Sequence, residues 1–195
     1  MIVILYNIRS MHNVGSIFRT ADAAGVEKIF LCGITPEPVD KFGRKRQRIT
    51  KVSLGAEDYI PWEKCHSAAR LIDKLKKQGC LILAIEQSKK SIPYYEFSPS
   101  QFCHSELVLE STKEMPKPSD AKALAGRQVR HDGIAELPRK IVLVLGNEIR
   151  GLPHSVLNRA DKILEIPMRG KKESLNVAVA FGIVAFHLAR GAANN

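Results

Sequence analysis

Residues 1–33 read MIVILYNIRSMHNVGSIFRTADAAGVEKIFLCG. The run from Ile2 to Tyr6 is short, apolar and β-branched, which is typical of a buried strand. From Asn13 to Gly25 the apolar residues recur at helical spacing, with Asn13 suited to cap a helix and Gly25 to end it. Lys28 to Cys32 is a second apolar run. The stretch therefore predicts a βαβ unit with a right-handed crossover.

The same alternation continues along the chain. A helix is expected over residues 63–78, and it ends at Gly79. Buried strands are expected at Leu81–Ile85, Ile141–Leu145 and Lys162–Ile166. A last helix is expected from Ser174 to about Arg190. It is apolar on nearly all faces, which predicts burial in the core or at a subunit interface. The pattern predicts an α/β fold with a mostly parallel sheet flanked by helices.

Two segments depart from this pattern. Residues 37–52 are expected to form a loop that carries a run of basic residues. Residues 104–140 contain MPKPSDAK and follow no clean period, so we interpret them as an insertion or excursion. A length of 195 residues otherwise fits a single domain over residues 1–195.

Composition narrows the partners and the compartment. Thirty Lys and Arg against 20 Asp and Glu leave a net charge of +10, which favours a polyanionic partner, either nucleic acid or an anionic membrane. The four cysteines form no CxxC pair and no histidine completes a zinc spacing, so we expect no metal and a reducing compartment. The N-terminus lacks the features of a signal peptide, and residues 177–189 are too short to span a bilayer. We therefore expect a cytoplasmic protein that binds no membrane.

The common nucleotide motifs are absent. The sequence contains no GxG, which argues against a Rossmann dinucleotide site and hence against a dehydrogenase. Neither GxxxxGK[ST] nor GxSxG occurs. Any cofactor must be held in another way.

Three segments carry residue types suited to chemistry. In NIRSMHNVGSIFR, residues 7–19, Asn13 precedes a helix and Arg19 follows on it. Gly15 would cost that helix about 1 kcal/mol relative to Ala, so we expect another chain or a ligand to approach it closely. VLGNEIRGL, residues 144–152, follows a strand end, where α/β sheets bind ligands. IPMRGKKESLN, residues 166–176, follows another.

Each segment alone also fits a purely structural role. Asn13 would then be only a cap, Gly15 a packing glycine and Arg19 a solvated helix residue. Residues 146–151 would be a glycine-bearing turn in which Glu148 caps the next helical segment, and residues 166–176 a basic loop before a capped helix.

Taken together, the segments resemble the SpoU (TrmH-like) branch of the SPOUT RNA methyltransferases. The matching motifs are Asn13-x-Gly15-x-x-x-Arg19, Gly146-x-Glu148-x-x-Gly151, and Pro167 followed by Ser174-Leu175-Asn176. The resemblance covers residues 1–103 and 141–191. It implies a deep C-terminal trefoil knot, a homodimer, S-adenosylmethionine as methyl donor, and methyl transfer to a ribose 2′-hydroxyl of tRNA or rRNA.

The resemblance also implies roles for individual residues. The catalytic set is Arg19, Asn13, Glu148, Ser174 and Asn176. The cofactor-binding set is Ala84, Ile85, Glu86, Leu145, Gly146, Asn147, Gly151, Ile166, Met168, Ser174 and Leu175. For RNA binding we expect the basic residues Lys41, Arg44, Lys45, Arg46, Arg48 and Lys51. The alternative is a non-catalytic RNA-binding or ribosome-assembly protein on the same fold.

Overall fold

The computed structural model describes residues 1–98 and 140–192. The strands in these ranges form one seven-stranded sheet in the order β3-β2-β1-β6-β4-β7-β5, and every neighbouring pair is parallel. The strands are β1 (Ile2–Tyr6), β2 (Lys28–Cys32), β3 (Trp62–Cys65), β4 (Leu81–Ile85), β5 (Ile92–Pro93), β6 (Ile141–Leu145) and β7 (Lys162–Glu165). The expected α/β fold with a parallel sheet is confirmed.

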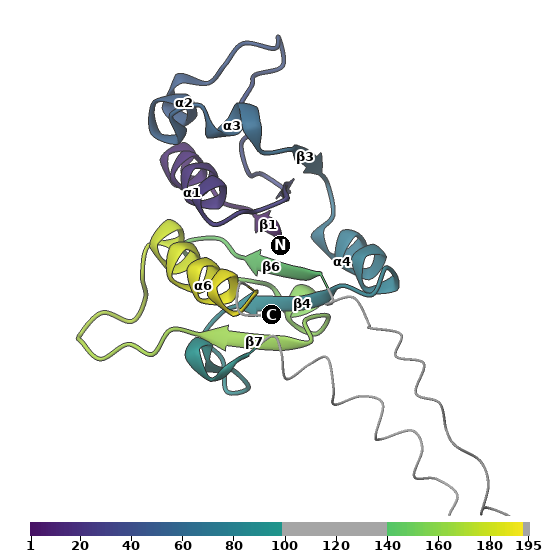
Figure 1. Cartoon of the computed structure of the whole chain (residues 1–195), viewed down its shortest axis with the longest axis vertical. Coiled ribbons are helices and arrows are strands. Elements are labelled where there is room, and N and C mark those ends of the chain that lie inside the picture. Colours follow the sequence, from purple (N-terminus) through teal and green to yellow (C-terminus); the bar gives the residue numbers. More distant parts are fainter. Residues whose placement is uncertain (99–139, 193–195) are drawn as a thin grey trace, which may run out of the picture.

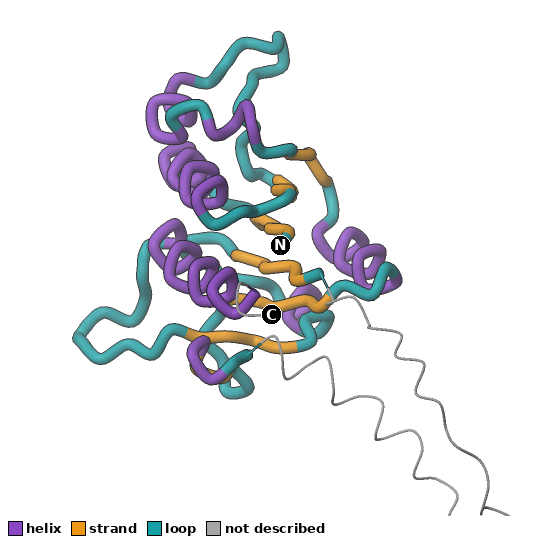
Figure 2. The backbone as a smooth tube through the Cα atoms, in the orientation of Figure 1, coloured by secondary structure: helices purple, strands orange, loops and turns teal. Residues whose placement is uncertain are grey.

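Helices cover both faces of the sheet (Figure 1). They are α1 (Met11–Ala23), α2 (Gln47–Ser53), α3 (Ala56–Tyr59), α4 (Ala68–Lys77), a 3-10 turn at Tyr94–Glu96, α5 (His154–Leu157) and α6 (Val177–Ala192). Helices α1 and α6 pack on one face, and α4 and α5 on the other. Figure 2 shows the long loops that join these elements, among them the one between β7 and α6.

The strands are hydrophobic on both sides because both faces are covered. Leu5 and Leu143 are fully buried in the core beneath α1 and α6. Their neighbours Ile4 and Val144 are fully buried in the core beneath α4 and α5. The near-continuous apolar runs in the sequence thus build two hydrophobic layers.

The strand order determines where a ligand-binding crevice forms. From β1 the chain moves outward through β2 to β3, whereas β4 lies on the other side with β6 between β1 and β4. At such a reversal the loops after neighbouring strands diverge and leave room for a ligand beyond the carboxyl ends. In this chain those loops follow β1, β6 and β4.

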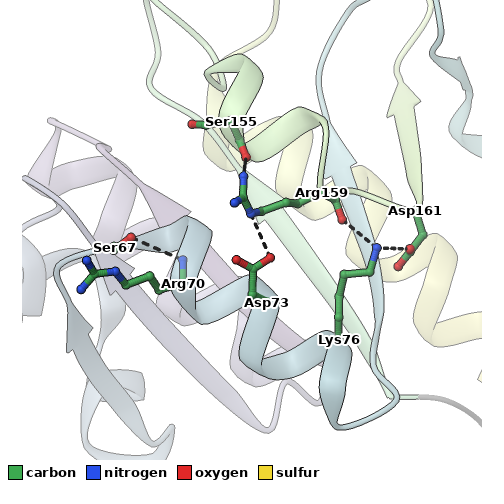
Figure 3. Close-up of polar contacts among 7 residues, drawn as sticks. All are labelled: Ser67, Arg70, Asp73, Lys76, Ser155, Arg159 and Asp161. Atoms are coloured by element: carbon green, nitrogen blue, oxygen red, sulfur yellow. Dashed lines mark hydrogen bonds and ion pairs between the residues drawn. The ribbon is translucent and has the colours of Figure 1, made fainter.

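Ion pairs tie α4 to the segment that leads into β7 (Figure 3). Arg159 Nε lies 2.9 Å from Asp73, and Lys76 Nζ lies 2.6 Å from Asp161. Asp161 also accepts a hydrogen bond of 2.8 Å from the backbone N–H of Ile82 in β4. Exposed pairs of this kind contribute about 1 kcal/mol or less each. Their consequence is positional, because they fix the chain that follows the 146–152 loop.

Several expected boundaries are wrong. The helix expected over 63–78 begins at Ala68, because residues 62–65 pair with β2 as strand β3. The loop expected over 37–52 contains most of α2, which runs from Gln47 to Ser53. The first helix is capped by Ser10, whose Oγ accepts from the N–H of Asn13 at 3.2 Å. The last helix begins at Val177 rather than at Ser174.

The insertion expected at 104–140 lies, apart from its last residue, outside the described residues. Within residues 1–98 and 140–192, no helix is long and apolar enough to cross a membrane. In the same ranges, no group of three or more His, Cys, Asp or Glu side chains is placed to hold a metal ion.

Candidate active site

A chain of hydrogen bonds joins the three sequence segments. Asn13 Nδ2 donates to Glu148 Oε1 at 3.0 Å, and Asn176 Nδ2 donates to Asn13 Oδ1 at 3.0 Å. Asn176 Oδ1 in turn accepts from the backbone N–H of Ala178 at 2.8 Å, at the start of α6. Asn176, not Ser174, is therefore the residue that caps α6. The first turn of α1 and the loops after β6 and β7 thus meet through three side chains.

Glu148 is the anchor of this network. It also accepts from the backbone N–H groups of Arg9 at 3.1 Å and Ser10 at 3.2 Å, just before α1. Burial by itself raises the pKa of Glu148, but its own backbone N–H and these donors outweigh burial, so the pKa is lowered. The carboxylate is ionised at neutral pH and lies at the positive end of α1. It caps the start of α1 rather than the residues that come after it in the loop.

Two side chains hold the 146–152 loop in shape. Asn147 Nδ2 donates to the carbonyl of Asn7 at 2.7 Å, and its Oδ1 accepts from two backbone N–H groups further along the loop. Glu86, at the end of β4, accepts from the backbone N–H of Leu152 at 2.8 Å. The loop is fixed at both of its ends.

The two glycines of this loop lie where a Cβ would meet neighbouring atoms of the chain. A Cβ on Gly146 would lie 2.6 Å from the carbonyl carbon of Gly151 and 2.7 Å from the nitrogen of Leu152. Gly151 has φ +61°, and a Cβ there would lie 2.1 Å from a Glu86 carboxylate oxygen. Gly146 must be glycine because backbone atoms approach it closely. Gly151 must be glycine because of its positive φ and because the Glu86 side chain lies close to it.

A cavity of about 220 Å³ opens beside this loop, between the ends of β4, β6 and β7 and the start of α6. The expected cofactor residues that line it are Ile85, Glu86, Leu145, Gly146, Asn147, Gly151, Ile166, Met168, Ser174 and Leu175. The exception is Ala84, which is fully buried within β4 and is not part of the lining.

Sequence reasoning missed some of the lining. Gln87, Ile149, Glu165, Val177 and Ala180 also contribute to the cavity wall. Val177 and Ala180 lie one helical turn apart, so the start of α6 at 177 would have pointed to both. Glu165 ends β7, directly before the predicted Ile166.

The charged residues that line the cavity are all acidic. Glu86, Glu148 and Glu165 contribute carboxylates, and no Lys or Arg of the described residues contributes to the wall. Leu145, Ile166 and other aliphatic side chains form the apolar part of the wall. Such a cavity suits a ligand that combines an uncharged ring with a positive centre.

Arg19 and Ser174 stand apart from the network. Ser174 is exposed and lines the cavity. Arg19 is exposed on α1 and is not part of the cavity wall. No hydrogen bond or ion pair joins the Arg19 side chain to another residue in the described part of the chain. Of the five expected catalytic residues, Asn13, Glu148 and Asn176 are brought together directly.

Gly15 has an explanation inside the chain. A Cβ at this position would lie 2.6 Å from the carbonyl oxygen of Ile49 and 3.0 Å from Val52 Cβ, both in α2. The expectation that another chain or a ligand approaches Gly15 is therefore wrong. The glycine lets α1 and α2 pack closely.

The basic segment divides into paired and unpaired charges. Arg44 Nε lies 2.9 Å from Asp40, Lys45 Nζ lies 2.5 Å from Asp58, and Arg46 Nε donates to a backbone carbonyl at 3.2 Å. Arg48 and Lys51 are exposed on α2 and form no ion pair with the residues that the structure describes. Lys41 is exposed in the preceding loop, with its Nζ over the ring of Phe42.

Comparison with known proteins gives a consistent result. The SpoU rRNA Methylase family matches residues 1–186. The chain is 27% identical over 184 residues to the 23S rRNA (guanosine-2'-O-)-methyltransferase RlmB of Neisseria meningitidis. The aligned region covers 94% of this chain and 56% of that protein. It is also 27% identical over 190 residues to the tRNA (guanosine(18)-2'-O)-methyltransferase of Aquifex aeolicus, covering 97% of this chain and 69% of that protein.

One solved structure is similar to this chain in both fold and sequence. It is the AdoMet-bound rRNA methyltransferase of Sinorhizobium meliloti, with a TM-score of 0.70 and 25% identity over 97% of this chain and 55% of that one. The chain spans a little over half the length of the Neisseria and Sinorhizobium proteins, at 56% and 55%.

Proposed function

Because the chain belongs to the SpoU rRNA methylase family, we propose that it transfers a methyl group from S-adenosylmethionine to a ribose 2′-hydroxyl of tRNA or rRNA. The observation that carries the proposal is the Glu148–Asn13–Asn176 network beside the acid-lined cavity. It joins all three motifs at the sheet edge where α/β proteins bind ligands.

The lining residues fit this cofactor. Aliphatic side chains from β6, the loop after β7 and the start of α6 offer a surface for adenine, and Glu86, Glu148 and Glu165 offer negative charge for a cationic sulfur. When bound, S-adenosylmethionine supplies an activated methyl group. The chain's own contribution is to hold that group beside the start of α1, and Asn13 and Glu148 fix this start.

Arg19 and the basic residues would act on the acceptor RNA. A ribose 2′-hydroxyl becomes a strong nucleophile as its proton leaves, so negative charge develops on the oxygen. A guanidinium has no acceptor for that proton, so the proton passes to solvent water at this exposed site. The role of Arg19 is to stabilise the charge that develops on the oxygen. Arg48 and Lys51, free of ion pairs with the described residues, would bind RNA phosphates.

We also propose a homodimer that buries one face of α6. Val179 and Phe186 are 51% and 50% exposed and lie seven residues apart on that helix, so they share a face. With the half-buried Ile183 between them they form an apolar strip, and exposed apolar surface of this kind marks interaction sites. Gly15 gives this proposal no support, because α2 covers it. The trefoil knot implied by the family stays a prediction, as do the single domain over 1–195 and the cytoplasmic location.

The test is cofactor binding together with methyl transfer. Isothermal titration should show binding of S-adenosylmethionine and of its demethylated product. Total RNA from cells that lack this protein should accept labelled methyl groups at positions that resist alkali, because a 2′-O-methyl group blocks strand cleavage. The alternative, a non-catalytic RNA-binding or assembly protein, predicts RNA binding with neither ligand bound. That second result would overturn the proposal.

A further inference from the structure

The loop between β2 and α2 ends in a tightly built turn. Asp40 Oδ1 accepts from the backbone N–H groups of Phe42 at 2.8 Å and Arg44 at 3.0 Å. An antiparallel bridge between Val39 and Lys45 closes the turn. The N–H of Arg44, followed by that of Phe42, lowers the pKa of Asp40, so the carboxylate holds these bonds at neutral pH. We name residues 39–45 the Phe42 turn.

The turn presents an exposed aromatic ring with two cations close to it. Phe42 is 68% exposed, although phenylalanine is among the residue types most often buried. Lys41 Nζ lies 4.9 Å and Arg44 Cζ 5.0 Å from the centroid of its ring. Asp40 holds Arg44 in place through an ion pair of 2.9 Å. Lys41 makes no ion pair within the described ranges, so it can move to a new anion without breaking one.

The position of the turn leaves it accessible. The loop that carries it stands away from the sheet beyond α2 and α3 (Figures 1 and 2). Helix α2 follows directly and contributes Arg48 and Lys51. A rigid ring with cations around it and further cations on the next helix differs from a singly exposed side chain, which would need no explanation.

We propose that the Phe42 turn binds an unpaired nucleotide of the substrate RNA. Lys41 leaves the face of the Phe42 ring for a neighbouring phosphate, and the base stacks on the face that is freed. Arg44 contacts a phosphate while it stays paired with Asp40. Stacking of a base on an aromatic side chain is worth about 1–3 kcal/mol and requires a free base face, which a base inside a duplex lacks. An acidic protein segment would use the cations but would leave the ring without a flat partner. The inference rests on the proposed function, because it assigns part of the acceptor RNA to this surface.

The experiment compares two RNA probes by fluorescence anisotropy. One is a short unstructured single strand, and the other is a blunt duplex with the same number of phosphates. Phe42→Ala should raise the Kd for the single strand about tenfold and leave the Kd for the duplex within about twofold. The salt dependence of binding should not change, because no charge is removed. Phe42→Tyr should bind like the wild type, since it keeps the ring.

Controls separate this proposal from the function on which it rests. Tyr95→Ala removes another exposed aromatic side chain, outside the turn, and should leave both constants unchanged. If the wild type transfers methyl groups and binds RNA but Phe42→Ala binds both probes normally, only the Phe42 proposal is overturned, and a protein partner becomes the alternative occupant. An equal loss on both probes, or a loss that Phe42→Tyr shares, would also overturn it. A wild type that neither binds RNA nor transfers methyl groups overturns both proposals.

Discussion

The side chains of Asn13 and Asn176 are 163 positions apart in sequence and share a hydrogen bond of 3.0 Å. The same Asn13 amide donates to Glu148, so one side chain connects the first turn of α1 with the loops after β6 and β7. A shift in any one of these segments would be transmitted to the others through Asn13.

Glu148→Gln should weaken methyl transfer and, slightly, the fold. The amide keeps the shape of the side chain but places an N–H group where Glu148 accepts from the start of α1. We expect the single-turnover rate to fall about tenfold or more, because the start of α1 is displaced. The loss of unfolding free energy should be about 1 kcal/mol or less, since Glu148 is exposed to solvent. Glu173→Gln removes the same charge from an exposed loop and serves as the control.

The stability difference between Glu148→Gln and the wild type should depend on pH. The folded-state pKa of Glu148 is lowered, so its ionised form stabilises the fold above the ordinary carboxyl pKa. That stabilisation is lost as the pH falls through the folded-state pKa. Urea unfolding should therefore show a difference at pH 7 that shrinks below about pH 4. A difference that stays constant down to acid pH would contradict this assignment.

The network was predictable in its members but not in its bonds. Asn13, Glu148 and Asn176 were each expected from the motifs, yet no local pattern says that an amide will face a carboxylate 135 positions away. Helix capping gives a second example of what the sequence does not predict. Asn13 is a good cap by type, but its amide is used in the network and Ser10 caps α1 instead.

The sequence predicts the strands correctly where the hydrophobic runs are long and uninterrupted by polar residues. β1, β2, β4 and β6 lie where the sequence predicts them, because strands buried on both faces read as continuous apolar segments. β3 was missed, since WEKC is short and polar and becomes a strand only by pairing with β2. The close approach at Gly15 was predicted, but its partner, α2, was hidden in a segment that looked like a charged loop.

Gly146→Ala should abolish most cofactor binding by moving the 146–152 loop. The added Cβ would meet the backbone at Gly151 and Leu152 at 2.6–2.8 Å, so the loop must shift. We expect the unfolding free energy to fall by about 1–3 kcal/mol and the Kd for S-adenosylmethionine to rise about tenfold or more. Gly170→Ala is the matched control, because nothing lies within 4 Å of its Cβ position. Normal cofactor affinity in Gly146→Ala would show that the cavity is misassigned.

Replacement of Arg48 and Lys51 by Ala should weaken RNA binding through charge alone. Substitutions at Arg44 or Arg46 would also remove interactions that hold the Phe42 turn, whereas Arg48 and Lys51 have no ion pair with the described residues. The slope of log K against log salt should flatten by about 0.7–0.9 for each phosphate that the variant no longer neutralises.

The control for this charge effect is the double replacement of Lys74 and Lys77, which are exposed on α4 at the opposite face of the sheet. Cofactor affinity should stay constant in both double variants. An unchanged slope in the Arg48 and Lys51 variant would show that α2 does not contact RNA.

Phe186→Glu should convert the proposed dimer into a monomer. A carboxylate at this half-exposed position on α6 would have to lose its hydration in an apolar interface. Light scattering at micromolar concentration should report twice the chain mass for the wild type and a single chain for the variant. Leu54→Glu changes an exposed apolar residue elsewhere and should remain dimeric. A monomeric wild type would refute the interface directly.

Arg19→Lys should slow methyl transfer about a hundredfold or more while cofactor affinity stays nearly constant. Arg19 lies six residues after Asn13, about 9 Å along the axis of α1, and outside the wall of the cavity. It is therefore placed to act on an acceptor RNA that lies across α1 rather than on the cofactor. Lysine keeps the charge but loses the planar fork of donors that can stabilise an oxyanion while contacting a phosphate. Arg19→Ala loses both and should be slower still in single-turnover assays with saturating cofactor. Methyl transfer by Arg19→Ala at close to the wild-type rate would remove this residue from the mechanism.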